Sequence, residues 1–259
     1  MRTIWGRNLS ACCWLVLLVV AAVANGQESE FKQIEFDSLD GLKITADLYM
    51  TSTDKSQPFI VLCHQAGWSR GEYREIAPKL NAMGFNCMAM DQRSGKEVNG
   101  VVNETAARSK AANKGGDFVD AEQDIIAAVK HAQANLSTGK LLLWGSSYSA
   151  ALVLRVAGEH ADMVDGVLSF APGEYFAGQG KTKTWIASSV TKAQCPIFIT
   201  SAKREHRSWK DIFAAIKANG KTQFLPKTAG NHGSRALWDK FSDSDDYWKA
   251  VEGFLNQFQ

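Results

Sequence analysis

The chain has 259 residues, with 29 Lys and Arg against 27 Asp and Glu and a formal net charge of +2. Arg2 and Arg7 lie in the first segment, residues 1–26. Without them, the chain has 27 basic and 27 acidic residues. A neutral chain creates no field that gathers nucleic acid or anionic membrane, so we expect neither as a partner. After the first segment roughly 230 residues remain, which fits one large α/β domain.

The first 26 residues have the pattern of a secretory signal peptide. Arg2 and Arg7 flank the start of an apolar run over residues 9–23, and small residues follow it up to Gly26. The alternative is an uncleaved anchor, but the run is shorter than the ~20 residues that cross a bilayer comfortably. We therefore predict a signal peptide over 1–26, a mature domain over 27–259, export to the periplasm or the extracellular space, and no stable membrane insertion after cleavage.

Three cysteines, Cys63, Cys87 and Cys195, follow the first segment, each in or beside an apolar run. An odd number without metal-ligand spacing argues against a disulfide framework and against zinc. We interpret them as small buried hydrophobic residues, with one bridged pair as the alternative outside the cytoplasm. The sequence predicts no metal.

The pattern of apolar residues changes along the chain. Residues 31–50 alternate apolar and polar residues on either side of Asp40-Gly41, which predicts a hairpin of two half-exposed strands. Short apolar runs follow, and helical patterns separate them. The predicted strands are 59–63, 85–90, 141–144, 164–170, 197–200 and 221–225, and the predicted helices are about 71–83, 117–135, 148–158, 208–219 and 244–258. Apolar strands between helices predict an α/β fold with a mostly parallel central sheet, a leading antiparallel hairpin and helices on both faces. In such a sheet the ligand lies at the carboxyl ends of the strands.

Two serines compete as nucleophile. Ser69 lies in the only complete G-x-S-x-G match, residues 67–71, but a loop separates it from the preceding strand. Ser147 directly follows an apolar strand and precedes a helix-forming run, which is the strand–turn–helix context that a nucleophile elbow requires. We predict Ser147 as the nucleophile, although Ser149 stands where the motif has its second glycine.

A serine hydroxyl needs a base, and the base needs an orienting acid. Of the five histidines, His232 lies between glycines in a loop after the last predicted strand, where an imidazole reaches the edge of the sheet. Glu205 follows the strand at 197–200 and gives the chain order serine, acid, histidine that α/β hydrolases use. Glu174, after the preceding strand, is the alternative acid.

The oxyanion hole requires backbone N–H groups directed at the developing charge. Tyr148, the residue after the nucleophile, should supply one, and the loop at residues 64–67 should supply the other, with Gln65 as the predicted donor. Trp68 and Tyr175 are predicted to border the substrate.

These features resemble the α/β-hydrolase superfamily, and more narrowly its compact, dienelactone-hydrolase-like members, over about residues 31–258. The resemblance rests on the Asp40-Gly41 hairpin, the HQAG loop at 64–67, DQRSG at 91–95, the elbow at 145–149 and GNHG at 230–233. It implies hydrolysis of esters, lactones or related acyl bonds without metal or cofactor. Three positions depart from the pattern: Ser147 replaces the cysteine of dienelactone hydrolases, Ser149 replaces the closing glycine of the elbow, and Glu205 replaces the usual aspartate.

Three functions remain open from the sequence. The first is a serine hydrolase of small carboxylic esters or lactones, with a small-molecule ester as its partner. The second is a peptidase or amidase with the same triad, and the third is a silent, ligand-binding relative, because fold does not fix function. The interval 171–196, where lids are usually inserted, is too short for a large cap.

Overall fold

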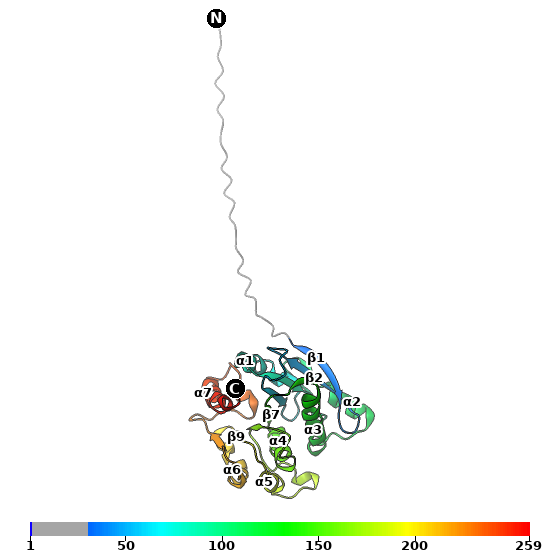
Figure 1. Cartoon of the computed structure of the whole chain (residues 1–259), viewed down its shortest axis with the longest axis vertical. Coiled ribbons are helices and arrows are strands. Elements are labelled where there is room, and N and C mark those ends of the chain that lie inside the picture. Colours follow the sequence, from blue (N-terminus) through cyan, green and yellow to red (C-terminus); the bar gives the residue numbers. More distant parts are fainter. Residues whose placement is uncertain (2–30) are drawn as a thin grey trace.

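The computed structural model describes Met1 and residues 31–259 (Figure 1). The predicted signal peptide therefore lies, apart from Met1, outside the described residues. Within the described part of the chain, no helix combines the length and apolar character that crossing a membrane requires.

One eight-stranded sheet forms the centre of the molecule, in the order β1-β2-β4-β3-β7-β8-β9-β10. β1 pairs antiparallel with β2 and β2 antiparallel with β4, whereas all later neighbours are parallel. The strands are β1 (Lys32–Asp37), β2 (Lys43–Tyr49), β3 (Phe59–Cys63), β4 (Asn86–Met90), β7 (Leu141–Ser146), β8 (Gly166–Phe170), β9 (Ile197–Thr200) and β10 (Thr222–Phe224). The predicted leading hairpin and mostly parallel sheet are confirmed.

Helices cover both faces of the sheet (Figure 1). On one face lie α1 (Ile76–Ala82) and α7 (Ser244–Leu255), and on the other lie α3 (Glu122–His131), α4 (Tyr148–Glu159), α5 (Trp185–Val190) and α6 (His206–Ala215). Successive side chains of a strand point to opposite faces, so Ile60 packs under α1 and α7 while Val61 packs under the other group. This burial on both faces explains why β3 has no polar residue.

A segment between β4 and α3 was not predicted. It contains the two-stranded hairpin β5 (Glu97–Val98) and β6 (Val101–Val102), followed by α2 (Glu104–Ala112). α2 covers the outer face of β2, where the Thr45 N–H donates to the Thr105 hydroxyl at 3.0 Å. The prediction of a half-exposed strand is therefore wrong for β2, whose residues from Ile44 onward are buried.

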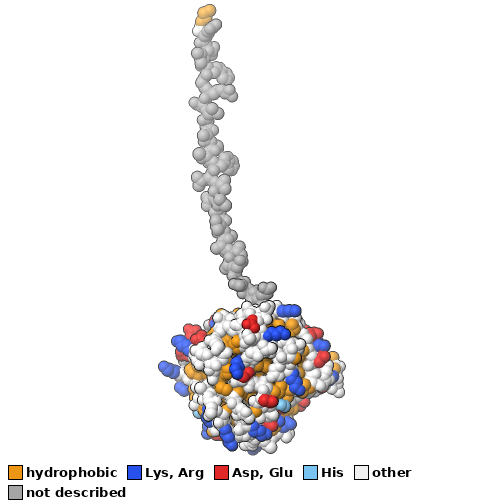
Figure 2. All heavy atoms as spheres, viewed as in Figure 1, with side chains coloured by type: hydrophobic (Ala, Val, Ile, Leu, Met, Phe, Trp, Pro, Cys, Tyr) orange, Lys and Arg blue, Asp and Glu red, His pale blue; other side chains and the backbone are white. Residues whose placement is uncertain are grey.

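The connection between β8 and β9 carries only a short turn and α5, so the described chain has no large cap. Short 3₁₀ or π-helical turns complete the fold at Arg70–Tyr73, Phe118–Ala121, Ala132–Leu136, Ala177–Gln179, Lys203–Glu205, Ser234–Leu237 and Asn256–Phe258. Basic and acidic side chains are interspersed on the face shown in Figure 2, in keeping with the balanced charge of the sequence. Cys63, Cys87 and Cys195 are buried and unbridged, as small core residues.

Candidate active site

Ser147 lies at a sharp turn between β7 and α4. Its backbone has φ +58° and ψ −119°, which is unusual for a residue with a side chain. The Ser147 N–H donates to the Phe170 carbonyl at 2.8 Å, which fixes the turn to the neighbouring strand β8. A Cβ atom at Gly145 would lie 2.4 Å from the Ser149 carbonyl oxygen, so the turn requires glycine there. This geometry is that of a nucleophile elbow.

The side chains of Ser147, His232 and Glu205 form a continuous hydrogen-bonded chain. The distance from Ser147 Oγ to His232 Nε2 is 2.8 Å, and the distance from His232 Nδ1 to Glu205 Oε1 is also 2.8 Å. Since a carboxylate only accepts, Nδ1 carries the proton and Nε2 is left to accept from the serine hydroxyl. The structure thus brings together the three residues that the sequence singled out, at the carboxyl ends of β7 and β9 and in the loop after β10.

The two rival residues are engaged elsewhere. Both carboxylate oxygens of Glu174 accept 2.9 Å hydrogen bonds from the N–H groups of Ile186 and Ala187, at the N-terminus of α5. Ser69 is fully buried, and its hydroxyl donates to the Val101 carbonyl at 2.6 Å. Glu174 therefore caps a helix, and Ser69 attaches its loop to the β5–β6 hairpin.

In the loop after β3, the Gln65 N–H is engaged and, in the part of the chain that the structure describes, the Ala66 N–H is free. The Gln65 N–H already donates to the buried Glu72 carboxylate at 2.8 Å. Within the described residues the Ala66 N–H has no acceptor. Tyr148 is the first residue of α4, so its N–H has no acceptor within the helix either. The N–H groups of Ala66 and Tyr148 thus both lack an acceptor among the described residues, whereas the N–H of Gln65, the predicted donor, is engaged.

His64 holds this loop in place as a neutral side chain. Its Nε2 accepts from the Gln92 N–H and from Asn103 Nδ2, both at 3.1 Å, so the proton resides on Nδ1, which donates to the Gln65 carbonyl at 2.8 Å. Burial lowers the pKa of His64 to about 4, with Arg70 lowering it further and the bond to Gln65 opposing both effects. His64 is thus a structural residue of the loop at residues 64–67, the candidate oxyanion loop.

Ser149 uses the hydroxyl that a glycine at this position would lack. It donates to the His64 carbonyl at 2.6 Å and accepts from Gln92 Nε2 at 2.7 Å. The departure from the motif therefore adds a buried link between α4 and the oxyanion loop.

The two predicted substrate-binding aromatics occupy different surroundings. The Tyr175 hydroxyl donates to the Ala171 carbonyl at 2.7 Å. Burial raises the pKa of Tyr175, as does the nearby Glu205 carboxylate, so this ring lies close to the acid of the hydrogen-bonded chain. Trp68 instead stacks on Trp238, with ring centroids 5.3 Å apart. Substrate contact by either ring stays a prediction.

One cavity lies at the hydrogen-bonded chain, and a second lies beside the loop after β3. The first, of about 510 Å³, is lined by Glu205 and His232 together with three cationic residues, Lys203, Arg204 and Arg235. The second cavity, of about 460 Å³, lies beside Gly67.

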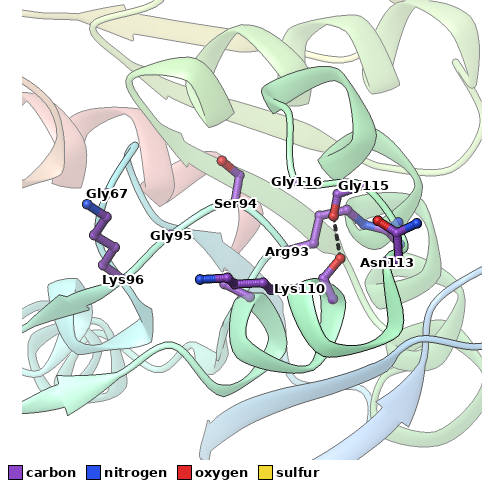
Figure 3. Close-up of a pocket in the computed structure, with 11 residues that line it drawn as sticks. Gly67, Arg93, Ser94, Gly95, Lys96, Lys110, Asn113, Gly115 and Gly116 are labelled. Atoms are coloured by element: carbon purple, nitrogen blue, oxygen red, sulfur yellow. Dashed lines mark hydrogen bonds between the residues drawn. The ribbon is translucent and has the colours of Figure 1, made fainter.

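Figure 3 shows this second cavity, with Lys96 at one side and Lys110 of α2 at another. No carboxylate lines it. Among residues 31–259 no group of three or more His, Cys, Asp or Glu is placed to hold a metal ion.

Comparison with known proteins agrees with this architecture. The esterase Pf2001 of Pyrococcus furiosus superposes with a TM-score of 0.67 at 18% identity, over 88% of this chain and 93% of that one. A dienelactone hydrolase from Anabaena variabilis gives a TM-score of 0.67 at 12% identity, over 89% and 99%. Est1E from Butyrivibrio proteoclasticus gives 0.65 at 14% identity, over 87% and 98%. At these identities the likeness shows the fold alone.

The sequence itself matches one family model. No curated protein matches the chain significantly. Residues 54–210, more than half of the chain, match the family described as serine aminopeptidase, S33. The matched segment includes the elbow and the oxyanion loop. The chain is therefore a hydrolase of the α/β-hydrolase superfamily and belongs to the S33 serine aminopeptidase family.

Proposed function

We propose that the chain hydrolyses small carboxylic esters or lactones through an acyl-enzyme on Ser147. His232 Nε2 takes the proton of the Ser147 hydroxyl as Oγ attacks the carbonyl carbon. The imidazolium then protonates the leaving alkoxide as the ester C–O bond breaks. Water, deprotonated by the same imidazole, then attacks the acyl-enzyme; the bond between the acyl carbon and Ser147 Oγ breaks, Oγ regains its proton from the imidazolium, and the acid leaves. Glu205 orients the imidazole and stabilises its charged form without taking the proton itself.

The oxyanion of each tetrahedral intermediate would be held by the N–H groups of Tyr148 and Ala66. Donors that are already oriented toward the developing charge act without reorganisation, and removing one such donor costs on the order of 10² to 10³ in kcat. Ala66 takes the role first expected of Gln65, because the Gln65 N–H donates to Glu72.

The observation that most supports the proposal is the Ser147–His232–Glu205 chain, whose two contacts are both 2.8 Å, at a turn of positive φ. Strained backbone persists where the surroundings enforce it, and it is frequent at active sites. The proposal needs no metal or cofactor.

The family description favours a second candidate, an aminopeptidase. Such an enzyme must bind the α-ammonium group of its substrate, and a carboxylate near the nucleophile would do so. The cavity at Glu205 and His232 is lined by three cationic residues and by one carboxylate, Glu205, which is bonded to His232. This charge distribution opposes an ammonium group, so we favour ester or lactone substrates.

We also propose that the chain is exported and that its leader is removed near residues 25–27. Sequencing the N-terminus of the exported protein should give a start at Asn25 or Gln27, because small residues precede both. A membrane-bound product that retains Met1 would contradict this proposal.

Turnover of three substrate types by the purified protein tests the function: nitrophenyl acetate, a small lactone, and aminoacyl nitroanilides. We expect turnover of the first two, lost in Ser147→Ala, and little turnover of the anilides. Preferred hydrolysis of anilides would favour the peptidase. Absence of turnover and of labelling by a fluorophosphonate would indicate a silent relative.

A further inference from the structure

Glu72 is a fully buried carboxyl group that the proposed reaction does not use. It lies in the short turn Arg70–Tyr73 after β3. Its Oε1 accepts from the Ser146 hydroxyl at 2.7 Å and its Oε2 accepts from the Gln65 N–H at 2.8 Å. Burying a carboxyl group away from water is costly unless the group is hydrogen-bonded. Glu72 is stabilised in the interior by these two hydrogen bonds.

The partners of Glu72 adjoin the residues of the site. Ser146 precedes the nucleophile, and Gln65 precedes Ala66. The Ser146 hydroxyl also accepts from the Ser234 N–H at 2.9 Å, two residues beyond His232. One carboxyl group therefore connects three segments: the end of β7, the oxyanion loop, and the loop at residues 230–235 that contains His232 (the histidine loop).

These three segments meet without spare room. A Cβ atom at Gly233, next to His232, would lie 2.5 Å from Ser146 Oγ and 3.0 Å from Gln65 Oε1. The loop that contains His232 therefore packs directly against both partners of Glu72.

The orientation of the Ala66 N–H depends on the same contacts. In a trans peptide the Ala66 N–H points away from the Gln65 carbonyl that shares its plane. Glu72 fixes the N–H of Gln65, and His64 Nδ1 fixes its carbonyl at 2.8 Å. Both backbone groups of Gln65 are held, so the next N–H is aimed before any substrate arrives.

We propose that Glu72 is a positioning residue for the hydrolysis proposed above: its carboxylate aligns the nucleophile, the oxyanion donor and the base by holding Ser146, Gln65 and, through Ser146, the histidine loop. This inference rests on the proposed function and adds a residue that touches no substrate.

The charge of Glu72 also acts on the site. His232 and Arg235 face it from the histidine loop, Tyr73 from its own turn and Tyr148 from α4. Burial raises the pKa of Glu72 to about 7, against the bonds from Ser146 and Gln65 and the positive charges of His232 and Arg235. When ionised, the carboxylate stabilises the imidazolium that forms at His232 during acyl transfer.

Glu72→Gln tests the proposal, because glutamine keeps the size of the side chain but removes its charge and one acceptor. With nitrophenyl acetate we expect kcat to fall on the order of 10-fold or more, less than the loss of an oxyanion donor, with KM within about twofold. The acid limb of the kcat/KM profile should move to lower pH, because the imidazolium loses a nearby negative charge. A purely structural role would not move that limb.

The matched control is Glu75→Gln, an exposed carboxyl three residues away, which should keep the wild-type kcat and profile. Ser146→Ala removes one contact of Glu72 and should lower kcat in the same way. If Glu72→Gln does not fold, the kcat of Ser146→Ala decides: a value lowered with KM unchanged supports the positioning role, and a wild-type value overturns it.

Wild-type kcat and an unmoved acid limb in the folded variants would overturn the positioning role. Failure of the proposed function itself would look different, because the wild-type protein would then neither turn over the ester nor react with a fluorophosphonate.

Discussion

The Ser149 hydroxyl donates a 2.6 Å hydrogen bond to the carbonyl oxygen of His64, which joins the first turn of α4 to the end of β3. The same hydroxyl accepts from Gln92, so a side chain that departs from the elbow motif satisfies two buried polar groups. Replacing Ser149 with the glycine of the motif should therefore destabilise the protein.

We predict that Ser149→Gly and Ser149→Ala both lower the free energy of unfolding, by about 1–3 kcal/mol, because the His64 carbonyl and the Gln92 amide lose their partner. The glycine variant should be the less stable, since glycine also weakens a helix by about 1 kcal/mol relative to alanine. Urea unfolding measures both, with the exposed Ser188→Ala as control. A glycine variant more stable than wild type would contradict this account of Ser149.

The two glutamates should behave differently. Glu205→Gln should lower kcat on the order of 10⁴-fold, because the amide no longer fixes the tautomer or supports the charge of His232. Glu174→Gln should retain most activity and lose about 0.5–2 kcal/mol of stability, because it caps α5. Steady-state kinetics and thermal unfolding of both variants separate the roles; equal activity in the two would place the acid elsewhere.

Short acyl chains should be preferred. The connection at residues 171–196 holds only a short turn and α5, so no cap encloses a long chain. A buried methylene contributes about 0.8 kcal/mol, roughly fourfold in kcat/KM, only while the protein covers it. Nitrophenyl esters should gain little beyond acetate to butyrate and decline by octanoate, without a jump at the micellar threshold. A steady rise through decanoate with interfacial activation would indicate an acyl channel.

Two buried groups give the stability opposite dependences on pH. Burial raises the pKa of Glu72 from 4.5 to about 7, so the folded state binds more protons than the unfolded state in that window and stability falls as pH rises. Burial lowers the pKa of His64 from 6.5 to about 4, so stability falls as pH drops through that window. Between pH 4.5 and 6.5 the two effects offset each other.

Glu72→Gln should expose the histidine effect alone. Relative to wild type, its free energy of unfolding should improve by about 3 kcal/mol as pH rises from 4.5 to above 7, which is the linkage expected for a shift of this size. Urea unfolding at several pH values measures the difference, and Glu75→Gln should follow wild type throughout. Parallel curves for wild type and Glu72→Gln would contradict the raised pKa.

The sequence predicted the elements whose signal is local. The apolar runs at Phe59–Cys63 and Ile197–Thr200 coincide with β3 and β9, because strands that are buried on both faces consist mainly of apolar residues. The strand–turn–helix context predicted the sharp turn at Ser147 between β7 and α4, whereas Ser69, in the motif match, lies buried in a loop. The loop with His232 followed from its glycines and its place after the last strand.

The sequence did not predict the parts of the fold that are held in place by polar contacts. β5, β6 and α2 were missed because the strands have two residues each and α2 is anchored by buried polar side chains, among them Thr105 and Asn103, rather than by an apolar stripe. Glu72 resembles an ordinary exposed glutamate in sequence. Its burial depends on Ser146 and Gln65, whose proximity only the folded sheet establishes.

The most direct test of Ser147 as the nucleophile is the site of covalent labelling by a fluorophosphonate, mapped by peptide mass spectrometry. We predict one adduct per chain, on Ser147, absent from Ser147→Ala and present in Ser69→Ala. Ester turnover should follow the same pattern, with a loss on the order of 10⁶ in Ser147→Ala and at most a few-fold in Ser69→Ala. An adduct on Ser69, or ester turnover that survives Ser147→Ala, would contradict it.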